Sequence, residues 1–212
     1  MTKFILGTLL SLLLGASAAL AQQNAQRFAP LKPDELTAEQ KAWAEQIAPP
    51  PRNGRITNPP YRAYARSIEL AQRLSPLSDY LRWHTSLPAR LSELAILITA
   101  REWSSQYEWS AHYPLAMKAG LDPAVADDIA HGRKPANMKD DEAALYQLVT
   151  EIRRDRKVSD ATYAEALKHF GERGIMDIIG ISGYYDLVSM TLITMQAEPR
   201  NKDVPLLPEL KR

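Results

Sequence analysis

Apolar residues recur at spacings of three and four along almost the whole chain beyond residue 60. Such spacing places them on one face of an α-helix. No segment alternates apolar and polar residues for long enough to predict a strand. The pattern predicts an all-α fold, with helices over residues 61–74, 78–84, 89–102, 105–119, 123–130, 140–155, 159–170 and 174–195.

The residues between these segments carry the usual signals of helix ends. Asp122 followed by Pro123 predicts an N-cap with proline at the first helical position. Gly120, Gly132 and Gly171 lie where helices are expected to end, because glycine readily adopts the left-handed conformation that closes many helices. These signals agree with the periodicity.

Residues 22–60 form an arm that is polar and rich in proline. One short helix is expected in its stretch DELTAEQKAWAEQIA, where Thr37 is a candidate N-cap. The stretch PPPRNGRITNPP that follows predicts a loop. We therefore expect this arm, a single-domain helical bundle over residues 61–197, and a C-terminal tail, residues 198–212.

Residues 1–21 have the order of a removable signal peptide. A positive start at Met1–Lys3 precedes the apolar run Phe4–Leu14, and Ala19-Leu20-Ala21 offers a cleavage site. The run is too short to cross roughly 30 Å of hydrocarbon as a helix, so cleavage is favoured over the alternative of a retained anchor. The sequence predicts a mature chain that begins at Gln22 and is exported, periplasmic or secreted, without membrane attachment.

Charge and cysteine content narrow the classes of partner. Removing residues 1–21 takes only Lys3 from the 26 basic residues, which leaves 25 basic residues against 25 acidic ones. A neutral chain without runs of like charge is not typical of a nucleic-acid or membrane-surface binder. There is no cysteine, which excludes thiol chemistry and disulfides. The expected partner is a small molecule or another copy of the chain.

The stretch GIMDIIGISGYYDLVSMTLITM, residues 174–195, is apolar on nearly every face of the predicted helix. Such a helix lies either at the centre of a bundle or at a subunit interface. Gly180, Ser182 and Gly183 would let another helix approach closely. The pattern indicates self-association, and the aspartates that interrupt it argue against a membrane span.

Glu108 and His112 are the strongest candidates for chemistry. Residues four apart on a helix share one face, so the Glu108 carboxylate is expected to bond one imidazole nitrogen and fix the tautomer. The other nitrogen would be left for a substrate, and such a pair can carry a proton near neutral pH. The alternative is a solvated helix pair without function.

Neighbouring residues have both functional and structural interpretations. Glu93, the acid of LSELAILITA, is either a member of the site or a partly buried residue paired with an arginine. Ser105 is a candidate substrate contact, but Ser105-x-x-Glu108 also matches a capping box. Tyr107 and Trp109 are further candidate substrate contacts. Core or interface positions fit the other aromatic residues Trp83, Trp103, Tyr184 and Tyr185, and they are also the structural alternative for Trp109. Surface or capping positions fit His84, His131 and His169.

Two long stretches resemble the carboxymuconolactone decarboxylase and alkyl-hydroperoxidase D family. They are LPARLSELAILITAREWSSQYEWSAHYPLAMKAGL and ALYQLVTEIRRDRKVSDATYAEALKHFGERGIMDIIGISGYYDLVSMTL, and the resemblance extends from about Leu31 to Met195. It implies all-helical subunits built round a helical hairpin. It also implies assembly as trimers or hexamers, with active sites near subunit contacts.

The resemblance places four positions in the site. In the hydroperoxidase branch they resemble Glu, Cys, Cys and His, which fall here on Glu93, Ser105, Glu108 and His112. Peroxide reduction is not expected, because it needs thiols and a serine hydroxyl is too weak an acid to replace one. In the decarboxylase branch the second cysteine position resembles a glutamate, as it does in this chain.

The resemblance implies loss of carbon dioxide from a small carboxylate or lactone. The protein would stabilise the charge that flows into the lactone carbonyl and would supply a proton. No metal or organic cofactor is implied. Two alternatives remain: a hydroperoxidase relative that has lost its cysteines, and a non-catalytic binding or assembly protein. Burial of Glu108 and His112 in a pocket would favour the enzyme.

Overall fold

The computed structural model describes residues 27–210, and these contain helices and no strands. The prediction of an all-α fold is confirmed for this range, whereas the predicted signal peptide, residues 1–21, lies outside it. The helices are α2 (Ala38–Ile47), α3 (Tyr61–Tyr64), α4 (Ile68–Trp83), α5 (Ala89–Glu102), α6 (Gln106–Lys118), α7 (Pro123–Ala130), α8 (Asp140–Thr150) and α9 (Asp160–Thr194), with a 3-10 turn at Pro33–Glu35 and a π-helical turn at Glu151–Asp155.

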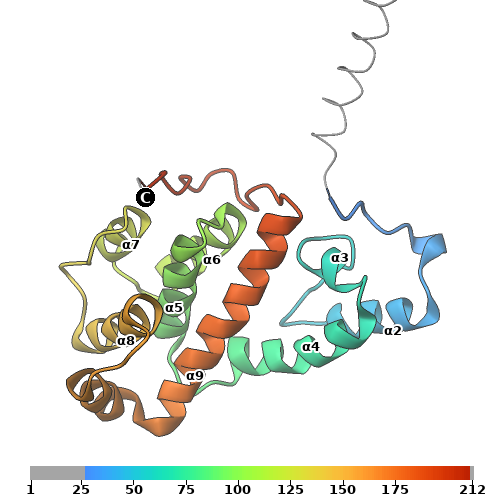
Figure 1. Ribbon diagram of the computed structural model, residues 1–212. Coiled ribbons are helices and arrows are strands. Elements are labelled where there is room, and N and C mark those ends of the chain that lie inside the picture. The colour runs from blue at the N-terminus through green and yellow to red at the C-terminus, as the bar shows by residue number, and fades with distance from the viewer. Residues whose placement is uncertain (1–26, 211–212) are drawn as a thin grey trace, which may run out of the picture.

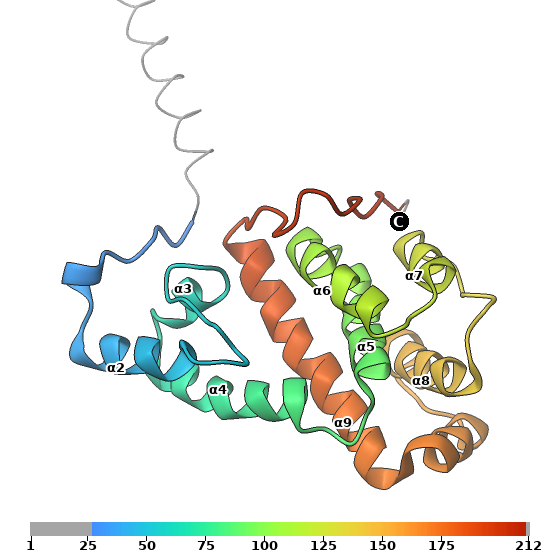
Figure 2. The same cartoon turned by 180° about the vertical axis from the view of Figure 1, so that it is seen from behind.

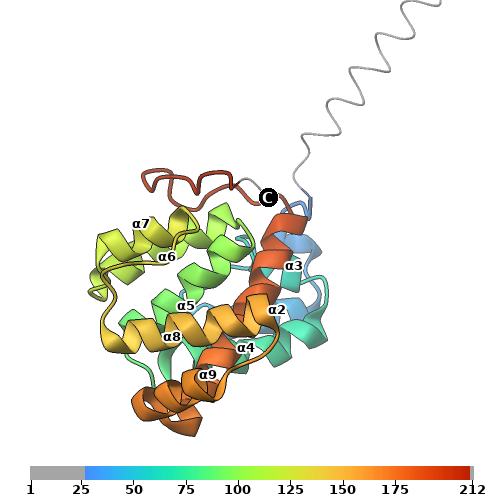
Figure 3. The ribbon, with the colours of Figure 1, turned by 60° about the vertical axis from the view of Figure 1, so that its left-hand side comes forward.

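Helix α5 is the centre of the bundle. It contacts α6, α7, α8 and α9, which lie around it in Figures 1 and 3. Leu94, Ala95 and Leu97 are completely buried, which is what a helix covered on several sides requires. Residues on this helix are therefore held firmly by the core.

A tight turn joins α5 to α6 and fixes how the two helices face each other. Ser104 adopts a left-handed conformation with φ of 52°, and the Ser105 amide donates to the Ala100 carbonyl at 2.8 Å. Helix α6 ends as predicted at Gly120, with φ of 88° and the Leu121 amide bonded back to Ala116 at 3.0 Å. The hairpin thus brings side chains of α5 opposite side chains of α6.

The N-terminal arm is packed against α3 and α4. Thr37 caps α2 in a capping box with Gln40, which confirms the predicted start. Trp43 and Ile47 are buried with residues of α3 and α4, and the Trp43 indole donates to the Ser75 hydroxyl at 2.9 Å. This second core extends across the predicted boundary at residue 60.

One predicted helix break is wrong, and another is confirmed. Helix α4 runs through Pro76, although a break was expected after residue 74, because residues on both sides of the proline, including Leu74 and Leu81, are buried against the protein. Packing there outweighs the lost backbone hydrogen bond. The predicted helix end at Gly171 is confirmed, because its φ of 63° and ψ of 175° are not helical and form a kink between the two helical segments that make up α9.

Residues 198–210 of the C-terminal tail lie across α6 without helical structure. Figures 1 and 2 both show it running from the end of α9 over α6 toward α7. Gln106 bonds the Leu207 backbone twice, at 2.9 Å each, and the Arg200 amide donates to the Ser110 hydroxyl at 2.8 Å. Between residues 27 and 210, no helix has the length and apolar character needed to cross a membrane.

Candidate functional site

The hairpin brings Glu93 of α5 against His112 of α6. The Glu93 Oε2 atom lies 2.6 Å from Nδ1 of His112. Both side chains are buried, so water competes little with this hydrogen bond. The structure thus gives Glu93 the role that the sequence assigned to Glu108, which is to hold one nitrogen of the ring.

Arg82, near the end of α4, approaches the other nitrogen. Its Nη1 lies 3.2 Å from Nε2 of His112. A guanidinium can only donate hydrogen bonds, so Nε2 must accept and Nδ1 must carry the proton that bonds Glu93. The contacts therefore define one tautomer of His112, with the lone pair on Nε2.

Glu108 lies on the same side of the ring as Arg82. Its Oε2 is 3.3 Å from Nε2 of His112, yet that oxygen is buried without a hydrogen-bond partner. Burial raises the pKa of Glu108, although His112 and Arg82 act in the opposite direction. The carboxyl group is thus held near Nε2 with a pKa above its ordinary value.

Glu93 shows the opposite behaviour. Burial also disfavours its charge, but the charge that His112 carries when it is protonated, the hydrogen bond from His112 and the charge of Arg82 lower the pKa below its usual value. The two glutamates of the site therefore differ in protonation tendency because only Glu93 has a close hydrogen-bond partner. Such a difference is typical of sites that move protons.

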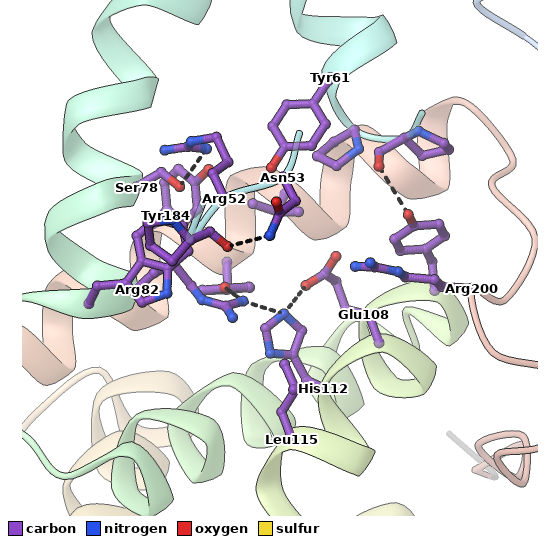
Figure 4. A pocket seen from close by; sticks show the side chains of 18 residues that line it. Arg52, Asn53, Tyr61, Ser78, Arg82, Glu108, His112, Leu115, Tyr184 and Arg200 are labelled. Atoms are coloured by element: carbon purple, nitrogen blue, oxygen red, sulfur yellow. Dashed lines mark hydrogen bonds and ion pairs between the residues drawn. The ribbon is translucent and has the colours of Figure 1, made fainter. Parts of the chain in front are cut away.

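A cavity of about 300 Å³ opens in front of Nε2, Glu108 and Arg82. Its wall comes from the loop between α2 and α3, from α4, α6 and α9, and from the C-terminal tail. Figure 4 shows Arg200 of the tail reaching toward Glu108. Arg52, Arg82 and Arg200 all line this cavity, whereas Glu108 is its one acidic lining residue in the described chain.

Arg52 is held in place on the wall by the N-terminal half of the molecule. It donates to Asp79 at 2.6 Å and to the Ser75 carbonyl at 2.9 Å. The guanidinium groups of Arg52 and Arg82 lie 5.6 and 5.7 Å from the ring centre of Trp83. Trp83, which the sequence assigned to a core or interface, lines the cavity.

The other predicted substrate contacts fall in different places. Tyr107 lines the cavity and donates to the Pro59 carbonyl at 3.0 Å, and burial raises its pKa to about 12. Trp109 is in the core, with its ring centre 5.8 Å from that of Tyr113. It is not among the residues that line the cavity.

Ser105 occupies the N-cap position of α6 but accepts no hydrogen bond from the helix. The predicted capping box is wrong, because the Glu108 side chain turns inward toward His112 and cannot return to the cap. The Ser105 hydroxyl is buried without a partner, and Ser105 is not among the cavity-lining residues.

Sequence analysis did not assign most of the cavity residues to the site, and four of these have polar groups that bear on its chemistry: Arg52, Arg82, Arg200 and Tyr185. They come from four separate segments, so no local spacing joins them to His112. The pair Tyr184-Tyr185 was the one available signal, and it was assigned to a core or interface. Among residues 27–210, no group of three or more His, Asp or Glu side chains is placed to hold a metal ion.

Comparisons with known proteins agree with the fold. No family model and no curated protein matches the chain. The chain is similar to the crystal structure of an uncharacterized peroxidase-related protein from Silicibacter sp. TM1040, with a TM-score of 0.66 and 16% identity over 85% of this chain and 95% of that one. The likeness establishes a shared helical fold.

Proposed function

We propose that this protein is a cofactor-free enzyme that acts on a small carboxylate or lactone by acid–base chemistry, as a decarboxylase-like carbon–carbon lyase. The observation that carries the proposal is the orientation of His112. Its Nδ1 is bonded to Glu93 at 2.6 Å, while its Nε2 lies beside the cavity. A histidine held in this way can transfer a proton to or from a bound molecule.

The reaction needs a proton donor and a stabilised negative charge. When the bond to the carboxylate breaks, carbon dioxide leaves and the electron pair moves into the conjugated carbonyl. A proton is then added at carbon. Glu108 and Nε2 of His112 are close enough to share that proton, at 3.3 Å, and burial raises the pKa of Glu108.

The charge of the cavity suits an anionic ligand. Three arginines line it, and Arg52 and Arg82 are fixed by hydrogen bonds before any ligand arrives. Pre-positioned guanidinium groups bind carboxylates without the cost of ordering long side chains. This favours a small carboxylate over a neutral ligand.

The two alternatives are less well supported. The neighbour of similar fold is described as peroxidase-related, but this chain has no cysteine to perform thiol-based peroxide reduction. A non-catalytic binding protein has no need for a buried acid next to an oriented histidine. Glu108 and His112 are 3% and 5% exposed and line a cavity, which favours the enzyme.

The direct test is a screen for release of carbon dioxide from small lactone carboxylates and related acids. The wild type should convert at least one compound, and His112→Gln should not exceed the uncatalysed rate. His131→Gln is the matched control, because His131 is exposed on another helix and bonds only within its own turn. Conversion that survives in His112→Gln would contradict the proposal.

We also propose that the chain is exported and self-associates as a trimer or hexamer. Met176, Ile179, Met190 and Ile193 are exposed on α9, whose opposite side is buried in the core. Burial of such apolar side chains at roughly 25 cal/mol per Å² would favour association. The molar mass from light scattering should correspond to three or six chains, and Ile193→Glu should lower that mass. Mass spectrometry of the native protein should give a start near Gln22.

A further inference from the structure

The hydroxyl of Tyr185 lies in the cavity wall beside His112. Tyr185 comes from α9, is 3% exposed and lines the cavity. Its ring meets that of His112 edge to face, with 5.1 Å between ring centres. The hydroxyl is thus beside the imidazole but is carried by a different helix.

Arg82 bonds this hydroxyl and leaves its hydrogen free. Arg82 Nη1 donates to the Tyr185 oxygen at 3.0 Å and also contacts Nε2 of His112 at 3.2 Å. The Tyr185 oxygen acts as the acceptor in this bond, so its own O–H remains available as a donor. Within residues 27–210, no acceptor takes that hydrogen bond.

We infer that Tyr185 and Arg82 form an oxyanion-binding pair, in which the Tyr185 hydroxyl donates to the oxygen that becomes negative when the substrate reacts. The inference rests on the proposed function and adds a catalytic residue that sequence reasoning placed in the core or an interface. A phenol that already accepts from a guanidinium is a stronger donor, because hydrogen bonds in a chain polarise one another.

The surroundings keep the phenol in its donor form. Burial raises the pKa of Tyr185 above its usual range, although the charge of Arg82 acts in the opposite direction. A neutral phenol in a buried wall stabilises an oxyanion without having to reorganise. The ligand class is therefore a carbonyl or enol compound that becomes an enolate or dienolate, with its oxygen at Tyr185.

Binding of para-nitrophenolate tests this inference without a known substrate. The phenolate presents a stable oxyanion on a small ring, and para-nitroanisole has the same ring without the charge. Absorbance titration should give preferential binding of the phenolate by the wild type. Tyr185→Phe should weaken phenolate binding about tenfold or more, the usual value of a hydrogen bond to a charged group, and should leave anisole binding unchanged.

Tyr113→Phe is the matched control. It removes the same atom one residue after His112, from a side chain that is not among those lining the cavity, and it should bind the phenolate like the wild type. Circular dichroism checks that each variant is folded. If Tyr185→Phe fails to fold, the test is the preference of the wild type for one of the two ligands. Equal binding of phenolate and anisole by the wild type overturns the inference. Unchanged phenolate binding by a folded Tyr185→Phe also overturns it.

The outcome is separate from that of the proposed function. Phenolate binding requires no turnover and no proton transfer by His112. Turnover without selective phenolate binding would reject the oxyanion pair and leave the acid–base proposal in place. Selective binding that depends on Tyr185, in a protein without turnover, would support the pair and reject the proposed enzyme.

Discussion

The two sides of the His112 ring differ in what surrounds them. On the Nδ1 side, a single carboxylate from the central helix of the bundle makes a short hydrogen bond, at 2.6 Å to Glu93. On the Nε2 side, Glu108, Arg82 and the cavity meet, and one Glu108 oxygen has no partner. The first side fixes the ring, whereas the second keeps unsatisfied groups ready for a ligand.

This difference shows how one residue type can take two roles within a few ångströms. Glu93 and Glu108 are both buried, but the pKa of Glu93 is lowered and that of Glu108 is raised. The cause is the partner: Glu93 accepts a hydrogen bond from Nδ1 of His112, whereas Glu108 is buried without a hydrogen bond that would offset the loss of water around its charge. Substitutions on the Nδ1 side should therefore change stability and its pH dependence differently from substitutions on the Nε2 side.

The largest effect should come from His112→Gln, which removes the imidazole ring and with it the contacts of both ring nitrogens. With a substrate in hand, kcat should fall by about 10²-fold or more, the usual contribution of a general acid or base. KM should change little, because the arginines that favour an anion remain. Steady-state kinetics measures both values. A large rise in KM with kcat preserved would place His112 in binding and not in chemistry.

The second effect isolates the Nδ1 side through Glu93→Gln. Loss of a buried hydrogen bond to a charged group should lower the free energy of unfolding by about 1.5–3 kcal/mol at neutral pH. A lowered folded-state pKa contributes stability above the unfolded-state value, and this is lost as pH falls through the folded-state value. Denaturant titrations should therefore find a difference from wild type at pH 7 that shrinks in acid.

Glu165→Gln is the control for Glu93→Gln. Glu165 also bonds a histidine, His169, at 2.9 Å, but the pair is at the surface. Exposed pairs contribute little, so this variant should unfold almost like the wild type. Equal losses in the two variants would mean that burial is not what makes the Glu93 contact strong.

The third effect concerns the Nε2 side, which Glu108→Gln changes alone. This substitution should raise stability, whereas Glu93→Gln should lower it. A raised folded-state pKa contributes stability below the unfolded-state value, and this is lost as pH rises through the folded-state value. The melting temperature of the variant should therefore be higher than that of the wild type at neutral and alkaline pH. In acid the two melting temperatures should be the same. Its kcat should fall by less than that of His112→Gln. Thermal melts across pH would contradict the account if the variant melted lower at neutral pH.

The smallest effect should come from Ser105→Ala, which lies on neither side of the ring. Its hydroxyl is buried without a partner, so its removal should leave the free energy of unfolding unchanged or raise it by up to about 1 kcal/mol. Ser159→Ala is the matched control, because that hydroxyl caps α9 by accepting from the Thr162 amide, and it should cost about 1 kcal/mol. A similar loss in both variants would restore the capping role of Ser105.

The sequence predicts the helices well where local signals decide them. Helices α5, α6 and α7 begin and end within a residue or two of the expected positions, and Thr37 and Gly120 mark real ends. The break expected near Pro76 is absent, because long-range packing holds the chain helical on both sides, whereas Gly171 does interrupt the helix as expected. Local propensity cannot register packing that comes from distant segments.

The candidate site is predictable only in part for the same reason. Spacing on one helix places Glu108 near His112, and the structure agrees. Which carboxylate accepts the hydrogen bond from Nδ1 depends on the angle between α5 and α6, and periodicity does not give that angle. Arg82, Tyr185 and the tail residue Arg200 reach the cavity from separate segments, so their roles become visible only in three dimensions.

The tautomer of His112 is the central claim, and nitrogen NMR tests it most directly. Long-range proton–nitrogen spectra of the labelled protein, with the signals assigned by comparison with His112→Gln, distinguish a protonated ring nitrogen from one that carries a lone pair. The account predicts a proton on Nδ1, a lone pair on Nε2, and a disturbed pattern in Glu93→Gln but not in Glu165→Gln. A proton on Nε2 with a bare Nδ1 would contradict it.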